Sequence, residues 1–232
     1  MKRATLTALV AIGTLLIAGC AQEDARFPDD TGFGGGECGA WYPGGGGADA
    51  GVDGGAEADY AVEEGAIFPC AVWESAMLDG QETFINVGQV HLEAKHGATE
   101  HKSIVVIVSA EECPACVELI GNMIERKDEF DAAGAFMIAM ARRSLHGAAD
   151  DPDFDLEKAY DVLQHEDWPV ESWHVINDEE DYLPLAVDDG PPWKIIISVE
   201  DMVVQVMSNI TFGTKESGVS EMLDYLNGPD FQ

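Results

Sequence analysis

Basic residues are scarce in this sequence. Its 12 lysines and arginines stand against 44 aspartates and glutamates, which gives a formal net charge of −32 at pH 7. Nucleic acids and anionic lipid headgroups are attracted by positive charge, so this composition excludes electrostatic binding to either of them. We therefore expect no nucleic-acid partner, and we interpret the acidity as a solvated, self-repelling surface.

Apolar runs long enough to span a bilayer are also missing. The uncharged run from Ala4 to Gly19 follows the basic pair Lys2 and Arg3 and is shorter than the roughly 20 residues that a transmembrane helix needs. A basic start before a short apolar run is typical of a secretory signal, which is removed from the mature chain. Residues 1–19 are therefore predicted to be a signal peptide.

The signal ends in Leu16-Ile17-Ala18-Gly19-Cys20, which resembles the lipobox of bacterial lipoproteins. The resemblance implies that Cys20 receives a diacylglyceryl group and an amide-linked acyl chain such as palmitate. These chains hold the protein on a membrane without spanning it. We expect an extracytoplasmic lipoprotein of the cell envelope, either periplasmic or on the outer membrane. An ordinary signal peptide with an incidental cysteine is the alternative.

Residues 20–65 have the composition of a tether. Twelve of the 25 glycines lie between Gly32 and Gly55, among many aspartates, glutamates and alanines. Such a stretch has little apolar surface to bury and loses much backbone entropy on ordering, so we expect a flexible, disordered linker. Cys38, with Trp41 and Tyr42 beside it, is the exception.

Residues 66–232 are enough for one domain. The β-branched run from Ser103 to Ser109 lacks alternation, which suits a strand covered on both faces. From Cys113 onward, apolar residues recur at the three- and four-residue spacing of a helix. The full expectation is strands at 84–87, 89–93, 103–109, 135–141, 173–176, 194–199 and 202–207, with helices at 113–131, 155–165 and 217–226. This order, β-α-β-α-β and then a hairpin and a helix, fits several α/β folds.

The sequence Cys113-Pro114-Ala115-Cys116 stands where a strand passes into a helix. At a helix N-terminus the unpaired N–H groups and the helix dipole favour the thiolate of the first cysteine. The second thiol lies one turn along, close enough to attack a mixed disulfide. Pro114 suits the first helical position, where a missing N–H costs nothing, so Cys113 is predicted to be the N-cap.

The segment from Ser103 to Cys116 resembles thioredoxins, and Pro192-Trp193-Lys194-Ile195-Ile196 resembles their cis-proline segment, especially that of the membrane-anchored TlpA type. The resemblance covers about residues 84–227. It implies a thioredoxin fold, a central mixed sheet flanked by helices, and a protein-disulfide oxidoreductase. Cys113 is then the nucleophile, Cys116 the resolving thiol and Pro192 the cis-proline. No cofactor beyond the thiols is implied, and the expected partner is a client or redox protein of the envelope, with the chain itself a monomer.

Three positions depart from the family pattern. Glu112 stands directly before Cys113, where an aromatic residue is usual. Its negative charge and that of Glu111 are expected to raise the pKa of the Cys113 thiol and so disfavour the thiolate. Ile107 replaces an acidic residue that many thioredoxins bury. Pro191 has no N–H to donate to a client peptide. A fold that binds without catalysis therefore remains an alternative to an enzyme.

The remaining alternatives concern the cysteines and histidines. Cys113 and Cys116 could instead form a static disulfide or half of a metal site, and metal delivery is a further hypothesis. The six histidines show no spacing typical of metal ligands, so we expect no metal. Cys38 and Cys70 are predicted to form a structural disulfide, because the compartment is oxidising. Their rival role is a relay to Cys113.

Overall fold

The computed structural model describes residues 43, 62–110, 113–142, 156–163, 173–177, 192–209 and 215–231. All of them belong to one compact unit, residues 34–232. The predicted signal peptide, Cys20 and Cys38 lie outside the described residues, as does most of the predicted tether.

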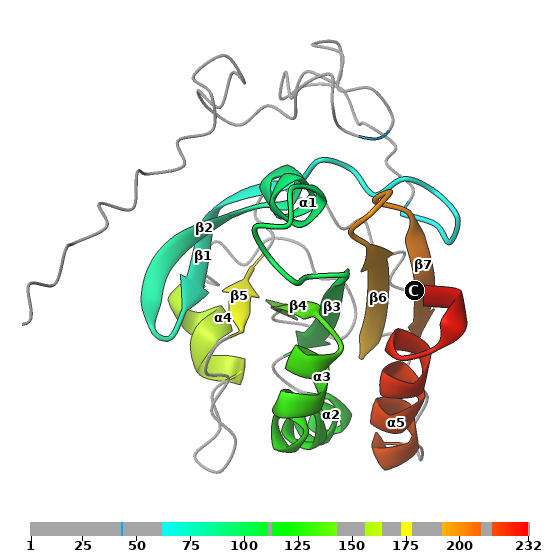
Figure 1. Ribbon diagram of the computed structural model, residues 1–232. Helices are drawn as coiled ribbons and strands as arrows, with labels where there is room; N and C mark the ends of the chain where they lie inside the picture. Colours follow the sequence, from blue (N-terminus) through cyan, green and yellow to red (C-terminus); the bar gives the residue numbers. More distant parts are fainter. Residues whose placement is uncertain are drawn as a thin grey trace, which may run out of the picture. The chain divides into compact units, whose positions relative to one another are not determined.

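A seven-stranded mixed sheet organises the described residues (Figure 1). Its strands lie in the order β2-β1-β5-β4-β3-β6-β7. The central strand β3 pairs in parallel with β4 and antiparallel with β6. All eight residues of β3 are buried, as its unbroken β-branched sequence predicts. The bounds are β1 Val72–Leu78, β2 Gln81–Asn86, β3 Ser103–Ala110, β4 Ala135–Arg142, β5 His174–Ile176, β6 Trp193–Ser198 and β7 Val204–Asn209.

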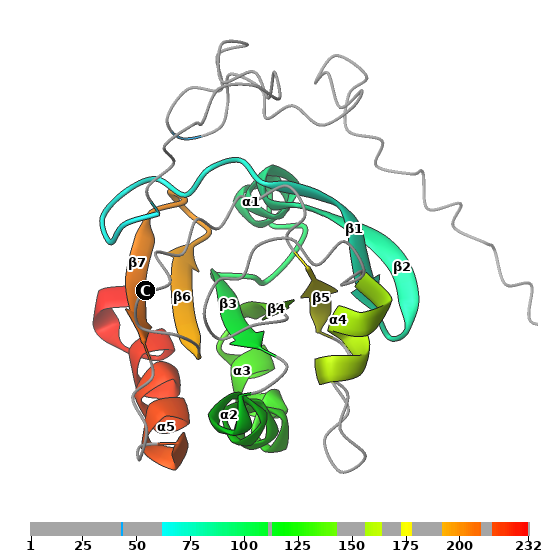
Figure 2. The same ribbon diagram turned by 180° about the vertical axis from the view of Figure 1, so that it is seen from behind.

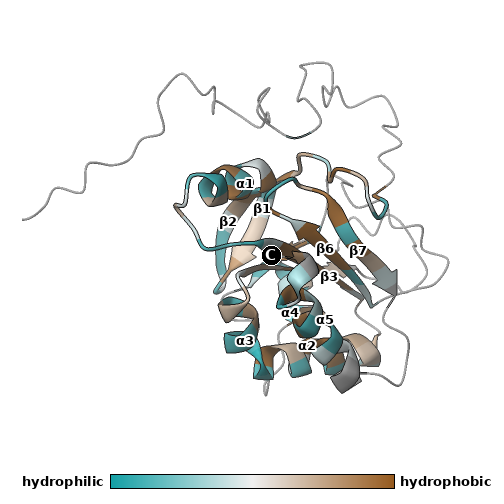
Figure 3. Ribbon diagram, turned by 45° about the vertical axis from the view of Figure 1, so that its right-hand side comes forward, coloured by the Kyte–Doolittle hydropathy of each residue, from teal (hydrophilic) through white to brown (hydrophobic). Residues whose placement is uncertain are grey.

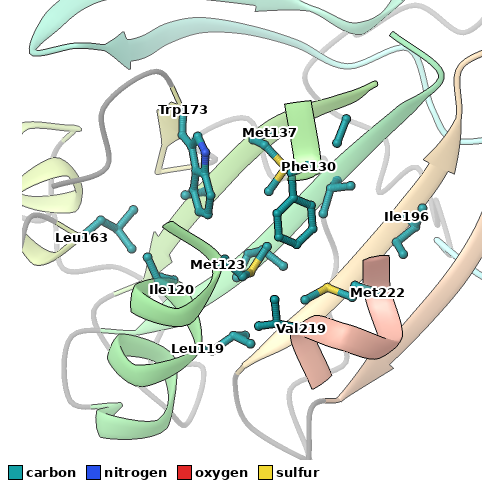
Figure 4. Close-up of a cluster of buried hydrophobic side chains, with 14 of the residues drawn as sticks. Leu119, Ile120, Met123, Phe130, Met137, Leu163, Trp173, Ile196, Val219 and Met222 are labelled. Carbon is teal, nitrogen blue, oxygen red and sulfur yellow. The ribbon is translucent and has the colours of Figure 1, made fainter. Parts of the chain in front are cut away.

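Helices cover both faces of this sheet. Their bounds are α1 Val87–Lys95, α2 Pro114–Glu125, α3 Lys127–Ala132, α4 Leu156–Leu163 and α5 Lys215–Leu226, and a 3-10 turn follows at Pro229–Phe231. Helix α1 packs on one face, where its Val90 joins a core that also contains Trp73 of β1. The other helices pack on the opposite face, where α3 contributes Phe130 and α5 contributes Met222 (Figures 2 and 4).

The order of elements confirms the predicted thioredoxin fold. After the lead-in hairpin and α1 the chain runs β3-α2-α3-β4-α4-β5, then the β6–β7 hairpin and the closing helix α5. The central strands β3 and β6 are largely hydrophobic, whereas α3 and α5 carry many hydrophilic residues (Figure 3). This pattern is typical of an internal sheet covered by amphipathic helices.

The prediction of a strand at residues 89–93 was wrong, because this stretch belongs to helix α1. Asn86 caps the helix: its side-chain oxygen accepts the N–H of Gln89 at 3.1 Å. Val87 and Val90 are buried at helical spacing, but five residues alone also fit the alternation of a strand. Strand β1 was not predicted at all, although its Trp73 is fully buried.

The residues that precede β1 pack against the outer edge of β7. The N–H groups of Gly65 and Phe68 donate to the carbonyls of Val204 and Met202, at 2.8 and 2.7 Å. A carboxylate oxygen of Glu64 accepts the Met207 N–H at 2.8 Å. Val62 is buried in the core, so the packed part of the chain includes residues before the predicted boundary at residue 66.

Candidate functional site

Cys113 stands at the junction between β3 and α2. Its N–H donates to the carbonyl of Ala110, the last residue of β3, at 3.1 Å. Its sulfur accepts the N–H of Cys116 at 3.1 Å, and Pro114 occupies the first turn of the helix. The predicted N-cap position of Cys113 is therefore confirmed. A sulfur in this place faces the positive end of the helix dipole.

Cys113 and Cys116 are joined by a disulfide, with their Cα atoms 5.2 Å apart. The pair is almost completely buried, since Cys113 is 2% exposed and Cys116 is 0% exposed. Ala110 and Ala115 are the other buried members of this small cluster. The bond can accept two electrons to give two thiols, and the helix N-terminus would then favour the thiolate of Cys113.

Pro192 lies at the same end of the sheet as the cysteine pair. It is buried and directly precedes β6. In the β3–β6 ladder Trp193 pairs with Val108, two residues before the end of β3. Two segments 80 residues apart in the chain are thus brought together, as the resemblance implies. The cis form of Pro192 and its role in substrate binding stay predictions.

Several residues named from the sequence lie outside the described residues. They are Glu111, Glu112 and Pro191, together with Cys20 and Cys38. Cys70 is disulfide-bonded. Its predicted pairing with Cys38 stays a prediction, because Cys38 is not described.

Lys194 was not singled out by the sequence analysis. It is buried, which is unusual for a charged side chain. One signal was available, because a lysine inside the apolar strand Trp193–Ser198 contradicts the composition of its neighbours.

A second cluster of polar residues surrounds a cavity of about 220 Å³ between the ends of β1, β4 and β5. The ring of Phe136 stacks on that of His174 and meets that of His101 edge-on. Burial lowers the pKa of both histidines, although Asp131 opposes this for His101, and a backbone hydrogen bond with Met137 does so for His174.

No group of three or more metal-ligating side chains occurs among the described residues. Within the same part of the chain, no helix is both long and apolar enough to cross a membrane.

The solved structures that are similar to this chain include several thiol:disulfide proteins. A thiol:disulfide interchange protein from Bacteroides sp. is 12% identical, with a TM-score of 0.44 over 72% of this chain and 93% of that chain. The thioredoxin domain of a thiol-disulfide oxidoreductase from Bacteroides vulgatus is 13% identical, with a TM-score of 0.44, and the match covers 70% of this chain and 99% of that chain. AhpC of Mycobacterium tuberculosis is 18% identical, with a TM-score of 0.49, and the match covers 71% of this chain and 98% of that chain. No protein-family model and no curated protein matches the sequence.

Proposed function

Because the chain has a thioredoxin fold with a cysteine pair at the start of α2, we propose that it is a membrane-anchored thiol-disulfide oxidoreductase. It acts on protein disulfides outside the cytoplasm. The observation that carries this proposal is the disulfide between Cys113 and Cys116, in which Cys113 is the helix N-cap. A redox-active pair needs one sulfur that is stabilised as a thiolate and a second within reach of it. The disulfide places the second sulfur within reach, and the position of Cys113 at the helix N-terminus supports the first condition.

The reaction starts from the reduced pair. The Cys113 thiolate attacks one sulfur of a client disulfide, the client S–S bond breaks, and a mixed disulfide with Cys113 forms. The Cys116 thiol then loses its proton to water and attacks the Cys113 sulfur. The client leaves as a dithiol with two electrons and two protons gained, and the Cys113–Cys116 bond is restored. A dithiol partner in the envelope must reduce the pair again.

We expect the purified domain to catalyse disulfide exchange more slowly than a general thioredoxin. The helix N-terminus favours a reactive Cys113, but Glu111 and Glu112 oppose its thiolate. The measurement is reduction of insulin by dithiothreitol, followed as turbidity, with Cys113→Ser as the control. Equal rates for the wild type and the control would contradict the enzyme function.

The range of clients is proposed to be narrow. Pro191 cannot donate a backbone hydrogen bond to an extended client peptide, so half of the pairing beside Pro192 is lost. Glu111, Glu112, Asp188 and Asp189 repel acidic partners if the loops meet near the cysteines.

The anchor is proposed from the sequence around Cys20. Palmitate fed to the source bacterium should label the wild-type chain, and Cys20→Ala should abolish the label, because the first acyl groups are attached through that thiol. The wild-type chain should be found in the membrane fraction, and Cys20→Ala should be found in the soluble fraction. A label that persists in Cys20→Ala would rule out Cys20 as the lipidated cysteine, whereas a wild-type chain without label would be an ordinary exported protein.

A non-catalytic binding protein is the second candidate. The observation that favours it is the burial of Cys113, a residue that is 2% exposed in the oxidised chain. A disulfide buried this deeply is poorly accessible to the thiol of a partner protein. The insulin assay distinguishes the two candidates, because a binding protein shows no exchange above that of Cys113→Ser.

A further inference from the structure

Lys194 carries a positive charge in the interior of the domain. The residue is 7% exposed. Its Nζ atom lies 3.9 Å from a carboxylate oxygen of Glu221 on α5, and the Glu221 side chain is 76% exposed. A partner that stays mostly in water neutralises a buried charge incompletely. The field of the Lys194 ammonium therefore extends into the surrounding protein.

Lys194 lies on the face of the sheet that α2 and α5 cover. Strand residues alternate between the two faces, so Lys194 shares its face with Ile196. Ile196 belongs to the apolar cluster that also contains Leu119 of α2 and Met222 of α5. Figure 4 shows Ile196 on β6 opposite these two helices. The ammonium thus lies on the same side of the sheet as the helix that begins at the cysteine pair.

The position of Lys194 along the sheet is also close to the pair. Its Cα partner on β3 is Ile107, three residues before Ala110, whose carbonyl accepts the Cys113 N–H. Three strand residues span roughly 10 Å along the sheet, and Cys113 follows Ala110 by three more residues. Charges about a Debye length apart are largely screened on a protein surface, but buried charges are screened much less. Both cysteines and Lys194 are buried, and the side chains of this face are mostly apolar.

We propose that Lys194 tunes the redox equilibrium of the Cys113–Cys116 pair: its buried ammonium stabilises the thiolate of the reduced pair and makes the disulfide easier to reduce. This role rests on the proposed thiol-disulfide chemistry of the pair. With two molecules of glutathione as reductant, the Cys113–Cys116 bond breaks and a glutathione disulfide forms. The pair gains two electrons; one proton goes to Cys116, and the other goes to water when Cys113 stays a thiolate.

The test is the equilibrium of the full mature chain with reduced and oxidised glutathione. Lys194→Met should shift this equilibrium toward the protein disulfide by roughly threefold to tenfold, or about 15 to 30 mV toward more negative potential. The pKa of the Cys113 thiol, measured from the pH profile of its alkylation rate, should rise. Glu221→Gln should change both quantities in the opposite direction, because it removes the charge that partly neutralises Lys194.

Two further variants serve as controls. Lys102→Met removes the same charge from an exposed lysine just before the opposite end of β3, so it should leave the potential unchanged. Lys194→Arg keeps the charge and should remain close to the wild type. The effect of Lys194→Met should also persist at ~0.5 M salt, where exposed charges are screened within a few ångströms.

The outcomes separate this inference from the proposed function. A potential in Lys194→Met equal to that of Lys102→Met, or a Lys194→Arg variant that behaves like Lys194→Met, overturns the role of Lys194. If Lys194→Met does not fold, the test rests on Glu221→Gln. An unchanged reduction potential in Glu221→Gln then overturns the proposed role of Lys194. A shifted potential in a protein that shows no insulin reduction supports the role of Lys194 and rejects the enzyme function.

Discussion

Replacing Cys116 by serine is expected to convert a short-lived mixed disulfide into a stable one. In the proposed reaction the Cys116 thiol attacks the bond between Cys113 and the client and releases the client. A serine hydroxyl cannot attack in this way, so the Cys113–client bond persists. Expression of Cys116→Ser in the source bacterium should therefore yield a few covalent complexes where the wild type yields none. Non-reducing gels and mass spectrometry of alkylated samples give the measurement.

The matched control is the double variant Cys113→Ser with Cys116→Ser, which should trap nothing because it lacks both sulfurs. The number of trapped clients is expected to be small, for the reasons given for Pro191 and the acidic residues around the pair. Complexes that survive in the double variant would mean that another cysteine forms them. Such a result would favour the relay role of Cys38 or Cys70 over a structural disulfide.

Replacing Phe130 by alanine is expected to lower the free energy of unfolding by about 3 to 5 kcal/mol. The Phe130 side chain is fully buried and lies between the sheet and α3, in the cluster that Figure 4 shows. Truncation removes apolar contacts and leaves a cavity that the surrounding strands cannot fill. Urea denaturation of the oxidised protein, followed by tryptophan fluorescence, measures the change.

Phe84→Ala provides a matched control for this prediction, because Phe84 is 60% exposed on β2. The same chemical change at that position should alter stability by only about 0.5 kcal/mol. If the two variants were equally destabilised, the packing described for the α3 side of the sheet would be incorrect. If Phe130→Ala kept the wild-type stability, the same conclusion would follow.

The sequence was most informative where a local pattern had one physical meaning. The β-branched run of β3 fits a buried strand in any context, and a proline after Cys113 favours a helix start. These two features placed the cysteine pair correctly. The prediction of a strand at 89–93 was wrong because five residues can fit both the strand period of two and the helix period of 3.6. The N-cap at Asn86 stabilises the helix that the structure has there.

Features that depend on distant segments could not be predicted in this way. The fully buried Trp73 lies on a strand that joins the sheet through pairing with β2 and β5, which are distant in sequence or not evident from it. The apolar neighbours of Lys194 in the sequence were a signal of its burial, but its partner on α5 is known only once β3, β6 and α5 are assembled. The ion pair with Glu221 joins residues that no local pattern connects.

The packing of residues 64–68 against β7 has a consequence for association between copies of the chain. The last strand of an open sheet presents unpaired N–H and carbonyl groups that can template pairing with another molecule. Here the Val204 N–H is taken by the Ala66 carbonyl and the Met207 N–H by Glu64, so part of this edge is already occupied within the chain. On the opposite edge, β2 exposes the charged Glu82 but also Phe84, which is 60% exposed. The β7 edge is therefore the better protected against strand addition, a useful property for an acidic domain that the proposed lipid anchor would concentrate on a membrane surface.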